Sequence, residues 1–172
     1  MTNAKPAVFE LIGDIDDDTM PLVHKLRVWG RGKKNEGRPL TLYISSDGGE
    51  LRAGIALYDT LRALVDHGHH LTTVVHGYAC SMAGLIFLAG DVRVIGPHSI
   101  FHIHEPSGMT GGTVTEVEDW TASFRAESEM LMGIYLDRTL LTRKVINKRT
   151  VRKDWYMGAE EAVKYGIDTN IG

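Results

Sequence analysis

A serine, a pair of histidines and several aspartates in this 172-residue chain are of the types that carry out nucleophilic catalysis. The serine, Ser81, follows a β-branched run at 71–76 and precedes an apolar run at 82–89. We interpret the pattern as a strand, a tight turn and a helix buried on all sides. Ser81 then lies at a helix N-terminus, where free N–H groups favour a developing negative charge. Taken alone, the stretch is most simply interpreted as a helix with Ser81 as its N-cap.

The histidines His102 and His104 lie in a predicted strand at 99–104, so their side chains project from the same face. An imidazole beside a serine can accept the hydroxyl proton, and a carboxylate can hold that imidazole in the required tautomer. The residues alone do not choose between these two histidines, nor among Asp91, Asp154 and Asp168. A metal site is the less favoured interpretation of the histidine pair, since no third ligand is evident.

Two adjacent glycines, Gly48 and Gly49, follow the predicted strand at 40–44. A plain strand-to-helix turn explains them, but such glycines also let the backbone approach a ligand or point an N–H outward. No Gly-Lys-Ser or Gly-Lys-Thr follows, which argues against a phosphate-binding loop. The close histidines His67, His69 and His70 are interpreted as part of a surface loop rather than as metal ligands. We therefore expect no metal and no cofactor.

Alternating strand and helix patterns must position these residues, and they favour a largely parallel α/β architecture in one domain, residues 1–172. The long helix from residue 113 to about 138 starts with Thr113 or Thr115 as N-cap, and a glycine-rich strand-turn at 105–112 precedes it. Its surface exceeds what one small core can cover, so part of it should pack on another subunit. Strands are predicted at 7–12, 40–44, 71–76, 91–95 and 99–104, an extended piece at 153–157, and further helices from 16, at 51–66, 141–151 and 158–165.

Composition excludes several classes of function. The apolar content of 43% and the charged content of 24% are those of a globular domain, and the net charge of −3 gives no basic surface for nucleic acid or membrane. Cys80 is the only cysteine, so no intrachain disulfide can form. The first six residues contain no apolar signal-peptide core, and no run is long enough to span a bilayer. We expect a cytoplasmic location.

Five motifs stand in order along the chain: YISSDGG at 43–49, Gly54 with IALYDT at 55–60, GYACSM at 77–82 with AG at 89–90, IHEP at 103–106, and DWYMGAEEAVKYG at 154–166. Each is weak alone. Together they resemble the Clp-type serine protease subunit, and the resemblance runs from about Val8 to Asp168. The serine, histidine and C-terminal motifs are in combination highly specific.

The resemblance implies a role for five residues. It matches Ser81 to the nucleophile, His104 to the general base and Asp154 to the triad aspartate. The backbone N–H groups of Gly49 and Met82 match the oxyanion hole. Removing one such donor typically raises the barrier by about 3–4 kcal/mol.

The resemblance also implies a crotonase-like spiral of ββα units with a protruding strand-helix handle at about 105–138. The partners it implies are polypeptide substrates, further copies in heptameric rings stacked in pairs, and an AAA+ unfoldase. The chain starts almost at the first core strand, so we expect the axial segment that helps dock the unfoldase to be reduced. It also stops soon after Asp168, and Asp47 replaces the proline usual beside the oxyanion glycines.

Four functions are compared. An active serine endopeptidase is the leading hypothesis, because all three triad positions are filled. A phage-type head-maturation protease would share the chemistry but act on capsid or scaffold proteins. A structural ring subunit would not need the triad, and a crotonase-type acyl-CoA enzyme would share only the spiral fold and the paired oxyanion N–H groups.

Overall fold

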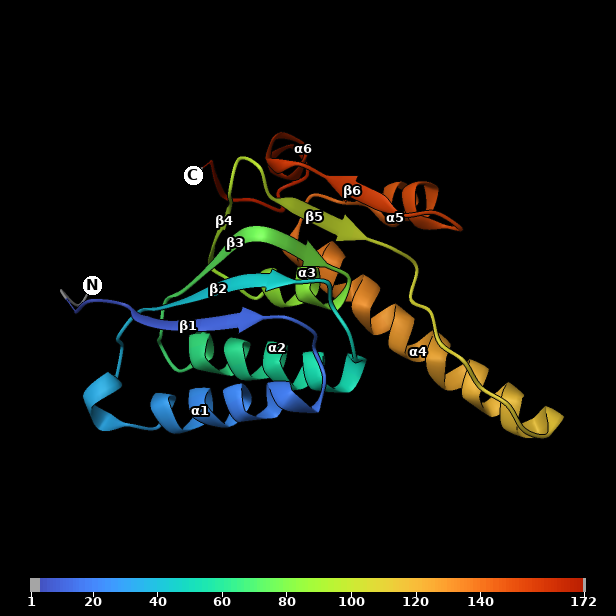
Figure 1. Cartoon of the computed structure of the whole chain (residues 1–172), viewed down its shortest axis with the longest axis horizontal. Helices are drawn as coiled ribbons and strands as arrows, with labels where there is room; N and C mark the ends of the chain where they lie inside the picture. The colour runs from blue at the N-terminus through green and yellow to red at the C-terminus, as the bar shows by residue number, and fades with distance from the viewer. Residues whose placement is uncertain (1–3, 172) are drawn as a thin grey trace.

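The computed structural model describes residues 4–171, so the first three residues of the N-terminal segment lie outside it. The described chain forms a twisted, mostly parallel sheet with helices packed on it (Figure 1), as predicted. The strands are β1 (Ala7–Ile12), β2 (Leu40–Ser46), β3 (Leu71–Cys80), β4 (Val92–Ile95), β5 (Ile100–Ile103), β6 (Trp155–Met157) and β7 (Asn170–Ile171).

The helices follow the apolar patterns of the sequence closely. The predicted helix at 51–66 has those bounds, because its apolar stripe packs on the sheet and a glycine follows its last turn. In Figure 1, α1 and α2 lie together along one side of the sheet, and the long α4 projects away from the body. The helices are α1 (Met20–Gly30), α2 (Leu51–Asp66), α3 (Met82–Phe87), α4 (Val114–Arg138), α5 (Arg143–Thr150) and α6 (Ala159–Lys164), with single 3₁₀ turns at Asp17–Thr19 and Lys33–Asn35.

Strand β3 divides the sheet and so positions the candidate site. Its first half pairs in parallel with β4, and its second half pairs in parallel with β5. Gly77, at φ 106°, lies where the pairing changes, a backbone conformation that favours glycine. The division brings the end of β5 beside the end of β3, and β6 then adds to β5 in antiparallel register. The residues after β3, at the end of β5 and before β6 thereby become neighbours.

The core includes the inward faces of β1, β2 and β3, the apolar sides of α1 and α2, and all of α3, and it extends to β5 and β6. Every residue of α3, from Met82 to Phe87, is buried, which confirms the prediction of a helix buried on all sides. Phe101 of β5 packs on Phe87 with ring centroids 5.9 Å apart, so the strand that carries the histidines is fixed to the helix that follows Ser81.

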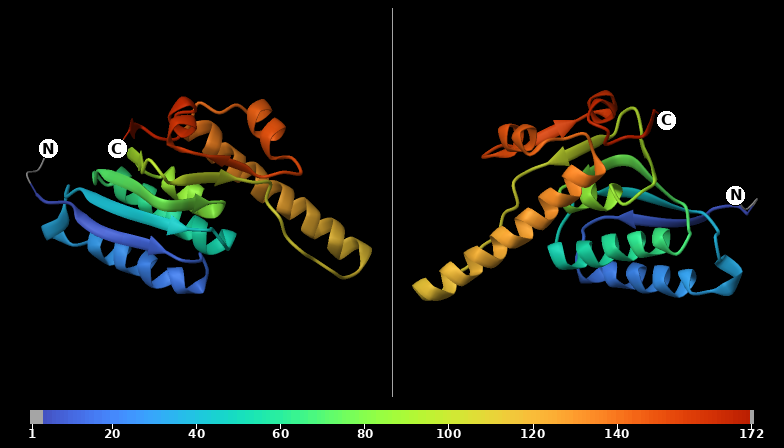
Figure 2. Two further views of the ribbon diagram at one scale, coloured as in Figure 1. Left: turned by 45° about the horizontal axis from the view of Figure 1, so that its top comes forward. Right: turned by 180° about the vertical axis from the view of Figure 1, so that it is seen from behind.

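The connection from residue 104 to 112 differs from the sequence prediction. It has no strand structure, whereas a glycine-rich strand-turn was expected there. It runs beside α4 instead (Figure 2), and Gly108 approaches the ring of Trp120. The physical reason is that no strand edge lies next to this segment in the described chain, and a strand without hydrogen-bonding partners is not stable in water.

Helix α4 begins at a capping box in which Thr113 is the N-cap, as the sequence allowed. The Glu116 N–H donates to the Thr113 hydroxyl, and the Glu116 carboxylate accepts from the Thr113 N–H. The bonds that the Glu116 carboxylate accepts from the Thr113 N–H and, second, from the Thr113 hydroxyl lower the pKa of Glu116. Of all residues of α4 only Tyr135 is buried, so most of the helix is solvent-accessible along its length. No helix within residues 4–171 has the length and apolar character needed to cross a bilayer.

Candidate active site

Ser81 occupies a strained turn between β3 and α3. Its φ of 52° and ψ of −120° lie outside the regions that a non-glycine residue normally adopts. It stands at the N-cap position of α3, but its hydroxyl makes no capping hydrogen bond, so the simple N-cap interpretation is wrong. Strain of this kind occurs where the surrounding structure over-determines the backbone, and a sharp strand-to-helix turn can expose a serine hydroxyl.

The turn at 46–49 holds this strained serine from one side. A Cβ atom on Gly48 would lie 2.7 Å from the Cys80 carbonyl oxygen and 2.8 Å from the Ser81 Cβ, so only glycine fits. The Gly48 carbonyl accepts from the Ile15 N–H at 2.9 Å, which ties the turn to the chain after β1. On the other side, the Ser81 N–H donates to the His102 carbonyl at 3.0 Å.

The Ser81 hydroxyl and His104 form a hydrogen bond. Ser81 Oγ lies 2.7 Å from His104 Nε2, a short distance for a hydroxyl bonded to an imidazole. His104 comes directly after β5, whose parallel pairing with β3 sets this separation. With the proton of His104 on Nδ1, Nε2 accepts from the hydroxyl, which is the arrangement that a general base requires.

Asp154 lies near both histidines but contacts only His102. The antiparallel pairing of β5 and β6 sets Ile103 opposite Trp155, so the next residue outward on each strand is His104 and Asp154. Asp154 Oδ1 lies 3.5 Å from His102 Nε2, and the structure has no hydrogen bond or ion pair between Asp154 and His104. The structure thus brings Ser81 and His104 together, and it places the third predicted side chain beside the neighbouring histidine.

His102 is the centre of a stack of aromatic rings. Its ring lies 4.2 Å from that of Tyr156 and 5.3 Å from that of His104, both at 10°. The side chain is 11% exposed, and its Nε2 is buried without a hydrogen-bond partner in the described structure. Burial and, second, the neighbouring His104 lower the pKa of His102, while the carboxylates of Asp154 and Asp47 oppose this shift.

The other aspartates that the sequence left open are engaged elsewhere. The Asp91 carboxylate accepts from the Leu71 N–H and pairs with Arg62. The Asp168 carboxylate accepts from the Ile95 N–H at 3.0 Å. Asp91 lies beside the start of β3 and Asp168 beside the end of β4, and neither lies at the end of β5.

Two backbone N–H groups are available to bind an oxyanion. Ile15 and Gly49 form a parallel bridge. In it the Ile15 N–H donates to the Gly48 carbonyl oxygen and the Glu50 N–H donates to the Ile15 carbonyl oxygen. This arrangement leaves the Gly49 N–H without a partner among the described residues. The Met82 N–H, at the first position of α3, is also unpaired within the described chain, as expected at a helix start.

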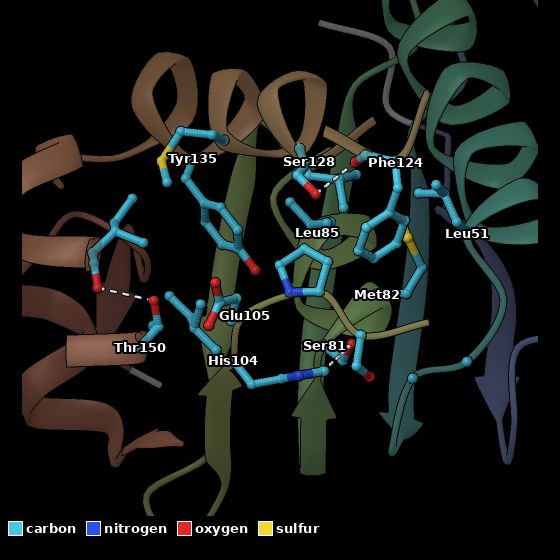
Figure 3. Close-up of a pocket in the computed structure, with 18 of the residues that line it drawn as sticks. Leu51, Ser81, Met82, Leu85, His104, Glu105, Phe124, Ser128, Tyr135 and Thr150 are labelled. Carbon is cyan, nitrogen blue, oxygen red and sulfur yellow. Dashed lines mark hydrogen bonds between the residues drawn. The ribbon is translucent and has the colours of Figure 1, made fainter. Parts of the chain in front are cut away.

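A groove of about 1100 Å³ extends from Ser81 and His104 between α3, α4 and α5. Figure 3 shows the Ser81–His104 contact on its floor and the side chains of Phe124 and Tyr135 directed toward it from α4. An ion pair between Arg143 and Glu129, at 2.8 Å, joins α4 to α5 along the groove. The apolar part of the wall includes Leu51, Met82, Leu85, Leu131, Met132 and Ile146.

Sequence reasoning missed Tyr156 and the α5 wall of the groove. Tyr156 alternates with Asp154 as His102 does with His104, so the period-two pattern of strands could have placed it on the same face. The α5 residues gave no such signal, because their place in the groove depends on how α5 packs against α4.

The loop histidines make three different contacts. His67 Nδ1 lies 2.6 Å from the Ala63 carbonyl oxygen and His69 Nδ1 lies 3.0 Å from that of Arg38. His70 pairs with Asp91 at 3.5 Å. Within residues 4–171 no group of three or more histidine, cysteine or acidic side chains is arranged to hold a metal ion.

A comparison with models of protein families shows which family the chain is similar to. The model of the family described as Clp protease matches residues 6–172, which is nearly the whole chain.

Proposed function

Because the chain belongs to the Clp protease family, and is therefore a peptidase, we propose that it is a serine endopeptidase. In this proposal Ser81 is the nucleophile, His104 the general base and Asp154 the triad carboxylate. The single observation that carries the proposal is the 2.7 Å contact between Ser81 Oγ and His104 Nε2 at a strained turn. A serine hydroxyl in such a contact loses its proton as it attacks a carbonyl carbon.

The reaction proceeds through an acyl-enzyme. Ser81 Oγ attacks the scissile carbonyl while His104 Nε2 takes the hydroxyl proton, and the N–H groups of Gly49 and Met82 donate to the oxyanion. His104 then gives the proton to the leaving amine, which departs and leaves an ester on Ser81. Water, deprotonated by His104, hydrolyses that ester. The carboxylate of Asp154 stabilises the imidazolium formed in both steps.

We propose further that the subunit works in a closed oligomer, a heptameric ring stacked in pairs around a chamber. The family implies oligomeric assembly and protein substrates. The exposed apolar residues of α4, such as Val114 at 74% and Met130 at 45%, support this proposal, since an isolated subunit would leave them in water. Sedimentation of the purified chain and native mass spectrometry would give the subunit number, and a monomer at micromolar concentration would contradict the proposal.

An AAA+ unfoldase is the partner that would feed such a chamber, and the cytoplasm is the location that we propose. The free Cys80 thiol fits a reducing compartment. Degradation of a folded reporter by the purified chain with a cognate unfoldase and ATP would support the partnership. Equal rates with and without ATP would argue against it.

Peptide hydrolysis tests the catalytic proposal directly. Purified protein should cleave a small fluorogenic peptide library, and a serine-directed fluorophosphonate should label it at Ser81. Both activities should be lost in Ser81→Ala, with unchanged circular dichroism. Labelling that persists in Ser81→Ala would assign the nucleophile elsewhere, and no labelling of the wild-type protein would favour a structural ring subunit.

A further inference from the structure

The buried nitrogen of His102 and the carboxylate of Asp154 are the two groups of the site whose interactions the triad does not explain. His102 Nε2 is buried with no hydrogen-bond partner in the described structure, which is costly for a polar atom. The nearest group that could satisfy it is Asp154 Oδ1 at 3.5 Å. This separation is longer than a formed hydrogen bond, but a small rotation of the carboxylate would close it.

Asp154 is free to make that movement. Its side chain is 55% exposed, and among the described residues His102 is the only group with which it forms an ion pair. Directly opposite residues on paired strands and their diagonal neighbours both lie within reach of a side chain. The Asp154 side chain can therefore contact either of two histidines: His104, which the strand register places opposite it, or His102, which lies on the diagonal.

We propose that His102 is a positioning residue that holds the Asp154 carboxylate away from His104, so that the carboxylate must move from one imidazole to the other before Ser81 is fully activated. The proposal rests on the proposed function, since it concerns the triad. The stack with Tyr156 and His104 fixes the His102 ring, which keeps its Nε2 directed at the position from which Asp154 must depart.

The charged and titratable groups that face His102 are His104 directly after β5, Asp154 directly before β6, Tyr156 on β6, Cys80 opposite it on β3, and Asp47 in the turn after β2. Of these, His104, Asp154 and Asp47 shift the pKa of His102 and so determine how its interaction with Asp154 depends on pH. Burial and His104 lower the pKa of His102 and so keep it neutral near pH 7, where an Nε2–H can donate to the Asp154 carboxylate once that carboxylate rotates toward it. Protonation of His102 on acidification strengthens its attraction for Asp154. The competition with His104 therefore increases as the pH falls.

His102→Phe tests the proposal because it keeps an aromatic ring in the stack and removes both nitrogens. We expect the variant to react with a fluorophosphonate about three- to tenfold faster than the wild type at pH 8, since the competent fraction rises. In a plot of the labelling rate against pH, the acid limb should shift to higher pH by about half to one unit, because a proton on His104 is then stabilised by Asp154. His102→Gln, which retains a donor at a similar place, should restore the slower rate.

Tyr156→Phe is the matched control, because it keeps the stacked ring and removes only an exposed hydroxyl. Its rate and acid limb should be those of the wild type. If His102→Phe is as folded as the wild type by circular dichroism but labels no faster, or if its acid limb does not move, the proposal is wrong. A structural role alone would lower the melting temperature without shifting the pH profile.

A second measurement does not depend on activity. Asp154→Asn removes the charge that raises the pKa of His102, so histidine-selective NMR should find the pKa of His102 lower in this variant than in the wild type. An unchanged His102 titration would overturn the proposed contact. If neither the wild type nor His102→Phe is labelled, the serine peptidase proposal fails, while the NMR result still decides whether His102 holds Asp154.

Discussion

Substitution of Gly49 by alanine should remove one oxyanion donor and leave the triad in place. A Cβ atom at Gly49 would lie 2.2 Å from the carbonyl oxygen of Ile15, a backbone atom in the bridge that holds this turn. The two segments must separate by roughly 1 Å to relieve that clash, a displacement that typically costs an enzyme about 10²-fold in rate. The φ of 145° at Gly49 adds strain for any L side chain.

We therefore expect kcat of Gly49→Ala to fall by about 10²–10³, with KM changed little, because in the proposed mechanism the Gly49 N–H donates only to the oxyanion. The assay is steady-state hydrolysis of a fluorogenic peptide at pH 8. Gly13→Ala is the matched control: Gly13 has φ 88°, but a Cβ there meets nothing within 4 Å. The control should lose stability of about 1 kcal/mol and keep kcat. The reasoning is refuted if the two folded variants have kcat values within threefold of each other.

Three further predictions concern buried groups and the start of α4. Arg93 donates to four carbonyl oxygens. Arg93→Met should therefore lower the free energy of unfolding, measured in urea, by about 3–5 kcal/mol, and Arg93→Lys should lower it by less. A loss below about 1 kcal/mol in Arg93→Met would contradict this. Burial and, second, Asp47 raise the pKa of Cys80 to about 11, so the thiol should be neutral and react slowly with iodoacetamide at pH 8. Asp47→Asn lowers that pKa and should speed alkylation about threefold. Equal alkylation rates in the two proteins would refute the role of Asp47. Thr113→Ala should speed amide hydrogen exchange in the first turn of α4 about fivefold, and unchanged exchange would show that the capping box does not hold that turn.

Features that depend on nearby residues could be predicted from the sequence. Helix α2 has its predicted bounds, and α4 starts at Thr113, one of its two predicted N-caps, because an apolar stripe and a capping side chain act within a few residues. The burial of α3 was equally evident from its composition. The segment at 105–112 was not predicted correctly, since glycine content says nothing about whether a partner strand lies alongside.

The geometry at Ser81 depends on contacts between distant segments and could not be predicted from its neighbours. Its left-handed backbone arises where the turn at Gly48 crosses the end of β3, and its hydrogen bond to His104 comes from the β3–β5 pairing. The position of Asp154 depends on the pairing of β5 with β6 across about fifty residues of chain, which no local pattern encodes. The family resemblance supplied the roles of these residues, and the roles remain predictions until variants are assayed.

The antiparallel pairing of β5 with β6 has a consequence for how such a chain can diverge. It pairs His102 with Tyr156 and Ile103 with Trp155, and so brings together the two ends of the segment from 104 to 154, which we call its base. The tip of that segment consists of the connection at 105–112 and the first turns of α4, and it is exposed and far from the base (Figure 2). Loop entropy changes slowly with length, so insertions and deletions there should be tolerated without shifting His104 relative to Asp154. Natural variation in length can therefore accumulate at the tip and alter what the tip meets, while the chemistry at the base is inherited unchanged.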